Sequence, residues 1–331
     1  MNNIKKIGLT ALAGSLVAFS ANAAEMSVSG STVLTYTSDS GQVTGNPLGM
    51  TSSVKFSASG EVNGYNVSYF ATTADSLTGM TSARLSVDMG DIGTISYDQG
   101  SGSGLSTIDD KTPTAAEEIW DGLDTTTSGR VGAVGSSGVL NYVNTFGGVT
   151  FNGAIKRGSG TANTDGSSSG DGEGSGWDFA LTTDGSMLGI DGLALGFGYG
   201  EVEAGSTAVT TGDNGDTTNM TGFVNYSIGP VTAGYQESTE DAGGSAGVSQ
   251  YSDRWGVAFN INENLSVSYG EAETEFSNPS AADVVESVEG VAIAYTMGSM
   301  KIAGNQNEGS NMGGTAGSDD SMTEIAVSFA F

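Results

Sequence analysis

Cysteine and histidine are both absent from the 331 residues of the chain. Without cysteine the chain forms no disulfide bonds, and without either residue it lacks the side chains of the common structural zinc sites. Serine–histidine and cysteine–histidine nucleophile pairs are excluded for the same reason, as is acid–base catalysis by histidine. These absences remove most of the familiar hydrolase chemistries from consideration.

Positive charge is scarce. Lysine and arginine together number 10 against 38 acidic residues, and the net charge is −28. A protein that binds nucleic acid needs a basic surface to neutralise phosphates, so nucleic acid is excluded as a partner.

Long apolar runs are also missing. Lys5 and Lys6 precede an apolar stretch from Ile7 to Phe19, and Ala21-Asn22-Ala23 follows it. This pattern predicts an export signal over residues 1–23 and a single mature domain over residues 24–331. The stretch is too short for a membrane-spanning helix, so a mature chain that spans a membrane does so with strands.

From residue 24 onward the dominant signal is an alternation of period two, interrupted by segments rich in Gly, Ser, Asp and Asn. It predicts an all-β chain of sixteen strands. The predicted strands are Met26–Tyr36, Ser53–Ser59, Tyr65–Thr73, Thr81–Met89, Gly93–Gln99, Val139–Phe146, Val149–Lys156, Gly176–Thr183, Leu193–Val202, Asn219–Ile228, Val231–Glu237, Tyr251–Ile261, Leu265–Thr274, Val288–Met297, Met300–Asn305 and Met322–Phe331.

The connections alternate in length. Short turns such as Val62-Asn63-Gly64 and Gly229-Pro230 alternate with long polar loops such as 159–175 and 307–321. Short turns at one rim and long loops at the other are typical of an up-and-down, antiparallel transmembrane β-barrel.

The strand cations support the same interpretation. Each falls out of phase with the large apolar residues of its strand, as Lys55 does between Val54 and Phe56. In a membrane barrel the apolar residues face lipid and the polar residues face the lumen. The other cations with this placement are Arg84, Lys156, Arg254 and Lys301.

The last strand alternates and ends on an aromatic residue, with Phe329 and Phe331 at its end. In this respect the chain resembles the Gram-negative general porins, and it is most similar to their sixteen-stranded alphaproteobacterial type. The resemblance implies that the two phenylalanines form an assembly signal read by the outer-membrane insertion machinery. It also implies a homotrimer in the outer membrane, in contact with its lipid.

The longest connection, from about Gly100 to Gly138, follows the fifth strand, where general porins place a loop that folds inward and narrows the lumen. By resemblance its acids face wall cations across a constriction; the alternative is a solvated surface loop. Thr114–Trp120 is expected to form a short helix begun by an N-cap Thr or by the nearby Pro113. The predicted constriction residues are Asp109, Asp110, Glu117, Glu118, Asp121, Asp124, Lys55, Arg84 and Arg130.

Further acid clusters occur in other loops, and carboxylate oxygens are the ligands that calcium prefers. None has the ordered spacing of a calcium loop, so a hydrated outer surface is the main interpretation and calcium binding the alternative. No other cofactor is expected. The acids concerned are Asp165, Asp171, Glu173, Asp213 and Asp216.

The expected function is a water-filled channel for passive diffusion of small hydrophilic solutes and ions, with a weak cation preference from the loop acids. An enzyme is not expected, although Glu118 and Asp121 are a carboxylate pair of the kind used in acid–base catalysis. The remaining alternative is a barrel that acts mainly as an adhesin or receptor through its loops.

Overall fold

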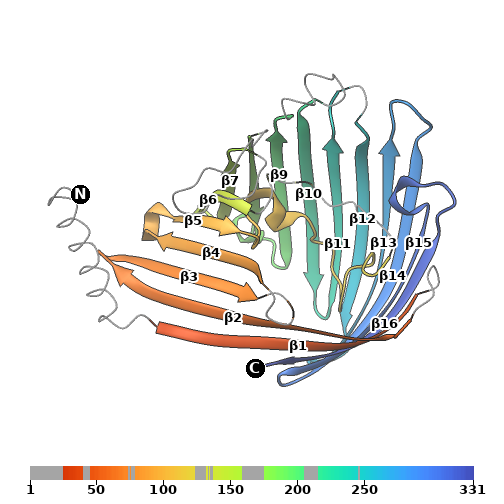
Figure 1. Cartoon of the computed structure of the whole chain (residues 1–331), viewed down its shortest axis with the longest axis horizontal. Helices are drawn as coiled ribbons and strands as arrows, with labels where there is room; N and C mark the ends of the chain where they lie inside the picture. Colours follow the sequence, from red (N-terminus) through yellow and green to blue (C-terminus); the bar gives the residue numbers. More distant parts are fainter. Residues whose placement is uncertain are drawn as a thin grey trace, which may run out of the picture.

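The computed structural model describes residues 25–39, 45–73, 75, 79–123, 132, 134, 137–158, 175–204, 215–244 and 247–331. Within these ranges sixteen antiparallel strands close into one barrel, in which β1 pairs with β16 (Figure 1). None of the helical segments described has the length and hydropathy needed to cross a membrane. The strands are β1 (Glu25–Asp39), β2 (Leu48–Val62), β3 (Tyr65–Thr73), β4 (Met80–Asp88), β5 (Thr94–Gln99), β6 (Ser137–Phe146), β7 (Val149–Lys156), β8 (Gly176–Thr183), β9 (Leu193–Val202), β10 (Thr217–Ile228), β11 (Val231–Asp241), β12 (Ser249–Asn260), β13 (Leu265–Ser277), β14 (Val284–Met297), β15 (Met300–Ser310) and β16 (Asp320–Ala330).

All sixteen predicted strands are confirmed, but several continue further toward the long loops than the sequence pattern indicates. β2 begins at Leu48 rather than Ser53, β11 continues to Asp241, and β15 continues to Ser310. The prediction followed apolar alternation, which ends before the ladder of backbone hydrogen bonds does. The ends of β11 and β15 carry polar side chains on both faces, so their sequence does not distinguish them from loop, whereas the start of β2 carries Leu48 and Met50 on its outer face.

The predicted alternation of turn and loop lengths is also confirmed. Between β2 and β3 the turn is Asn63-Gly64, and both residues have positive φ, at 53° and 84°. Two consecutive residues of positive φ fit a type I′ turn, whose twist matches that of the flanking strands. Other two-residue turns are 147–148, 229–230 and 298–299.

The two faces of the wall differ as the alternation predicts. Large apolar side chains on the outer face stand next to the strand cations and are substantially exposed: Phe56, Leu85, Ile155, Trp255 and Ile302. Successive strand side chains point to opposite faces, so the neighbouring cations face the lumen. These are Lys55, Arg84, Lys156, Arg254 and Lys301.

The end of the chain completes the closure of the barrel. The Gly30 N–H donates to the Phe331 carbonyl oxygen at 2.7 Å, and the Phe331 N–H donates to the Gly30 carbonyl oxygen at 2.9 Å. The Phe331 ring lies over Gly30, where a Cβ atom would come within 2.7 Å of it. Phe329 and Phe331 are both exposed on the outer face. Their part in assembly stays a prediction.

Candidate functional site

The connection after β5 enters the barrel and lies against the inner wall. Residues 103–123, called the lumen segment below, are bonded by lumen-facing side chains of strands from β4 to β15. In Figure 1 this segment is the golden-yellow trace that leaves the end of β5 and runs past β11 toward β14. It adds a second layer to the wall and occupies part of the lumen.

Arg84 and Asp98 hold the start of the lumen segment. Arg84 Nη2 lies 3.1 Å from Asp98 Oδ2 and also donates to the Gly102 carbonyl oxygen. Ser103 Oγ donates to the same carboxylate oxygen at 2.7 Å, and Asp98 is fully buried. Arg84, one of the predicted constriction cations, therefore anchors the segment. Its effect on permeating ions stays a prediction.

A second carboxylate, Asp178 on β8, binds the connection at two points far apart in sequence. Its Oδ1 accepts from the Leu105 N–H at 3.0 Å, and its Oδ2 accepts from the Val134 N–H at 2.9 Å. Asp178 is 3% exposed. Leu105 belongs to a short 3₁₀ helix, Gly104–Ile108, and packs with Ile108 in an apolar cluster on the inner wall. Asp178 thus holds the chain both as it enters the lumen and as it returns.

The middle of the lumen segment is fixed by Gln236 on β11, which is completely buried. Gln236 Nε2 donates to the carbonyl oxygens of Ile108, at 2.8 Å, and Asp109, at 3.3 Å. Its Oε1 accepts from the Lys111 N–H at 2.7 Å. One side chain therefore satisfies three backbone groups of the segment, which fixes its path along the wall.

Beyond Lys111 the segment lies on a row of glycines, called the glycine row below. It comprises four lumen-facing residues directly opposite one another on β11 to β14: Gly234, Gly256, Gly270 and Gly290. A Cβ atom at Gly256 would lie 2.7 Å from the Pro113 carbonyl oxygen, and one at Gly290 would lie 3.0 Å from Ile119 Cβ. Only a wall without side chains at this level lets the segment come so close.

The helix predicted over Thr114–Trp120 is wrong. These residues form bends and turns, and among the described residues of the connection the helical part is the 3₁₀ helix Gly104–Ile108. Backbone groups of this stretch bond to the wall. The Ala115 N–H donates to Ser268 Oγ at 2.9 Å, and the Glu118 carbonyl oxygen accepts from Asn307 Nδ2 at 3.2 Å.

Asp110, one of the predicted acids, lies beside Glu118 and near a cation that the prediction left out. Arg254 on β12 is 1% exposed and donates to Ser238 Oγ at 3.1 Å. Its guanidinium carbon lies 5.2 Å from the centre of the Trp120 ring. Burial, followed by the hydrogen bond and charge of Glu118, raises the pKa of Asp110 to about 7, and the charge of Arg254 opposes this rise. The sequence placed Arg254 on the lumen face but gave no means of pairing it with this loop.

A second acidic group lies where the lumen segment approaches β16. Burial and the nearby carboxylates of Glu324 and Glu118 raise the pKa of Asp121. Glu324 projects from β16 into the lumen and accepts from Thr37 Oγ1 at 3.3 Å. Glu117 is exposed beside these acids, and the positive charge of Lys301 attracts its carboxylate. Glu324 was not among the predicted constriction residues, because the alternation in its strand is the same as in the other strands and does not mark this residue.

The remaining predicted site residues are placed as follows. Lys55 is exposed on the lumen face, with its Nζ 4.2 Å from the centre of the Phe70 ring. Asp124 and Arg130 lie outside the described residues, as does the predicted export signal.

The calcium alternative concerns loops that are mostly outside the described ranges. Of its five acids only Asp216 is described, and it accepts from the Ala204 N–H at 2.9 Å. The described residues contain no group of three or more acids placed to hold a metal ion. Calcium binding stays a prediction.

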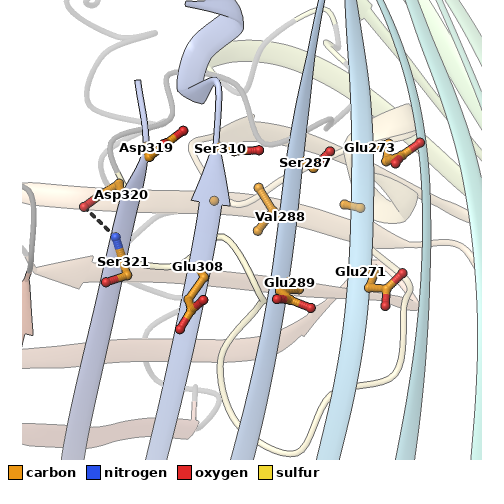
Figure 2. A pocket seen from close by; sticks show the side chains of 12 residues that line it. Glu271, Glu273, Ser287, Val288, Glu289, Glu308, Ser310, Asp319, Asp320 and Ser321 are labelled. Carbon is orange, nitrogen blue, oxygen red and sulfur yellow. Dashed lines mark hydrogen bonds between the residues drawn. The ribbon is translucent and has the colours of Figure 1, made fainter. Parts of the chain in front are cut away.

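The outer face carries acids of its own, above the apolar part of β11 to β15. Figure 2 shows Glu271, Glu289 and Glu308 side by side on three neighbouring strands, where they are directly opposite one another. Glu237, Asp253 and Glu273 form a second row of the same kind on β11 to β13. Tyr269 Oη lies 2.6 Å from a Glu271 oxygen and 2.8 Å from a Glu289 oxygen. We call these two rows the outer acidic rows. Such charge was predicted in the loops, not on the strands.

Comparison with known proteins gives a likeness of fold. No family model matches the chain, and no curated protein matches its sequence. The trimer form of OmpT from Vibrio cholerae has a TM-score of 0.66 at 11% identity, over 93% of this chain and 100% of that one. An anion-selective porin from Comamonas acidovorans has a TM-score of 0.65 at 12% identity, over 93% and 100%. OmpF from Salmonella typhi has a TM-score of 0.64 at 13% identity, over 94% and 99%.

These likenesses confirm that the chain has the sixteen-stranded fold of outer-membrane porins. A porin from Rh. blastica has a TM-score of 0.59 at 13% identity. The comparison therefore does not single out the alphaproteobacterial type.

Proposed function

We propose that this protein is a general diffusion porin of a Gram-negative outer membrane and passes small hydrophilic solutes and ions. The observation that carries this proposal is the reversed polarity of the barrel. Exposed apolar side chains cover the outer face, while Ser, Thr, Asn and charged residues line the inner one. A closed barrel of sixteen strands is wide enough for an aqueous channel, and the lumen segment narrows it.

The charge in the lumen supports a weak cation preference. The lumen segment and Glu324 of β16 contribute six acids, whereas Arg254 is buried against the segment, away from the water path. Lys55, Lys111, Lys156 and Lys301 reduce the resulting negative potential without cancelling it. The six acids are Asp109, Asp110, Glu117, Glu118, Asp121 and Glu324.

We also propose a homotrimer. The trimer form of the Vibrio cholerae protein, which covers nearly the whole of this chain, supports that assembly. A passive pore needs no catalytic group, and we propose no enzymatic activity.

The test is single-channel recording of the refolded mature protein in planar bilayers. Large openings in steps of three, with a reversal potential that favours cations, are expected. Since the chain has no cysteine, Asp121→Cys gives a single reactive thiol. A charged thiosulfonate reagent should reduce the conductance of this variant and leave that of Glu289→Cys, on the outer face, unchanged. A correctly folded barrel that never conducts would exclude a diffusion pore and favour an adhesin or receptor.

A further inference from the structure

The loop between β15 and β16, at the rim of long loops, folds into a compact shape. Residues 311–318 are called the covering loop below. The Met312 N–H donates to the Ser318 carbonyl oxygen at 2.7 Å, which closes the loop on itself. Asn311 and Gly313 have positive φ, at 56° and 62°. Both values lie in the left-handed region, which asparagine and glycine adopt at the lowest cost, so the local sequence favours this tight path.

A buried carboxyl group holds the covering loop against the inner wall. Glu286, on the lumen face of β14, is 2% exposed, and its Oε2 accepts from the Gly313 N–H at 2.6 Å. Gly314 lies on the Phe276 ring of β13, where a Cβ atom would come within 2.6 Å of the ring. One hydrogen bond and one close contact therefore fix the loop on the inner face of β13 and β14.

Met312 places the covering loop over the end of the lumen segment. Its side chain is 2% exposed and belongs to an apolar cluster with Leu123, Val288 and Met322. Met312 and Leu123 both lie on the bare backbone of Gly309. A Cβ atom at Gly309 would overlap the Met312 thioether and lie 3.3 Å from Leu123 Cδ1. Leu123, the last residue of the lumen segment, is thereby buried to 8% exposure.

An acid of the proposed constriction stands immediately before this contact. Asp121 is two residues before Leu123, and the Leu123 N–H donates to the Trp120 carbonyl oxygen at 3.2 Å across the turn that contains Asp121. Asn307 binds this turn from the wall, through the Asp121 carbonyl oxygen at 2.9 Å. The covering loop packs on its end. The direction of the Asp121 side chain therefore depends on both contacts.

We propose that Glu286 and Met312 are positioning residues of the constriction. Through the covering loop they hold the end of the lumen segment, and with it the Asp121 carboxylate, at a fixed place in the lumen. Both side chains are buried, so they act on permeating ions through Asp121 rather than directly. The inference rests on the proposed function, because a constriction has an effect only where the lumen conducts, and it makes a loop of the outer rim part of the selectivity of the channel.

The first test uses Leu123→Cys in the refolded mature protein, where it gives a single thiol because the chain has no cysteine. Mass spectrometry measures the rate at which this thiol reacts with a charged thiosulfonate reagent. Met312→Ala or Glu286→Leu, added to Leu123→Cys, should raise the rate about tenfold or more, since each removes a contact that keeps the thiol covered. Glu286→Gln keeps an oxygen acceptor for Gly313, and Glu273→Gln lies on the outer face of β13, so both should leave the rate low.

Reversal potentials of the same variants, without Leu123→Cys, test the effect on the constriction. Met312→Ala and Glu286→Leu should lower cation preference, and Glu286→Gln should restore the wild-type value although it removes the same charge as Glu286→Leu.

An unchanged thiol rate in Met312→Ala and Glu286→Leu would overturn the proposal. So would a faster rate with unchanged selectivity, or an equal loss of selectivity in Glu286→Gln, which would show a direct effect of charge. Heat-modifiable migration on gels identifies the folded variants, and Met312→Ala alone is sufficient if Glu286→Leu does not fold. A folded barrel that never conducts would refute the proposed function, whereas the thiol rates measure the position of the loop independently of conduction.

Discussion

Replacing Gln236 by leucine should release the lumen segment from the wall. Leucine has a similar volume but makes none of the three hydrogen bonds to the segment's backbone at 2.8, 3.3 and 2.7 Å. At about 1 kcal/mol net for each bond, the loss is about 3 kcal/mol. It shifts the equilibrium between bound and released segment by about 150-fold.

Single-channel recording measures this release. We expect Gln236→Leu to show a lower mean conductance and more open-channel noise, because the released segment enters the water path. Gln306→Leu is the matched control, since Gln306 lies on the outer face and, among the described residues, donates to Glu308 Oε1 at 3.1 Å and not to the lumen segment. Heat-modifiable migration on gels should show that both variants form the barrel. Identical noise and conductance in wild type and Gln236→Leu would refute the anchoring role of Gln236.

Three further outcomes are expected. The pKa of Asp110 is raised to about 7, so this acid becomes charged as the pH rises from 6 to 8. Reversal potentials should show cation preference rising over that range in wild type but not in Asp110→Asn. Arg84→Met leaves the buried Asp98 unpaired and should lower the free energy of unfolding in urea by about 3–5 kcal/mol, whereas Lys55→Met should change it little. Glu289→Gln removes repulsion from the opposite Glu271 and Glu308 and should raise that free energy by about 0.2–1 kcal/mol; a decrease would contradict it.

Much of the fold could be predicted from the sequence because a membrane barrel repeats one rule in every strand. Apolar outward residues and small or polar inward ones give a period-two signal, and short turns such as Asn63-Gly64 mark one rim. The strand ends near Asp241 and Ser310 were missed, because backbone pairing there is independent of side-chain polarity.

The site could be predicted only in part. The length and position of the connection after β5 indicated a segment inside the lumen, and the structure brings Asp110 and Glu118 together there. Arg254, whose charge acts on Asp110, is more than 130 residues away in the sequence, and pairing at such a distance depends on the register of the whole barrel. The predicted helix near Trp120 failed for the same reason, since the wall residues that bond the backbone of this stretch cannot be identified locally.

The glycine row determines how wide the channel is beside the lumen segment. The lumen segment rests on bare backbone at Gly256 and Gly290, so its distance from the barrel axis depends on what those two positions carry. A methyl group at either one would push the segment inward by a fraction of an ångström, and larger side chains would push it further. Relatives with the same number of strands and the same segment sequence can therefore differ in the size of solute they admit, through substitutions that touch neither the charges nor the length of the loop.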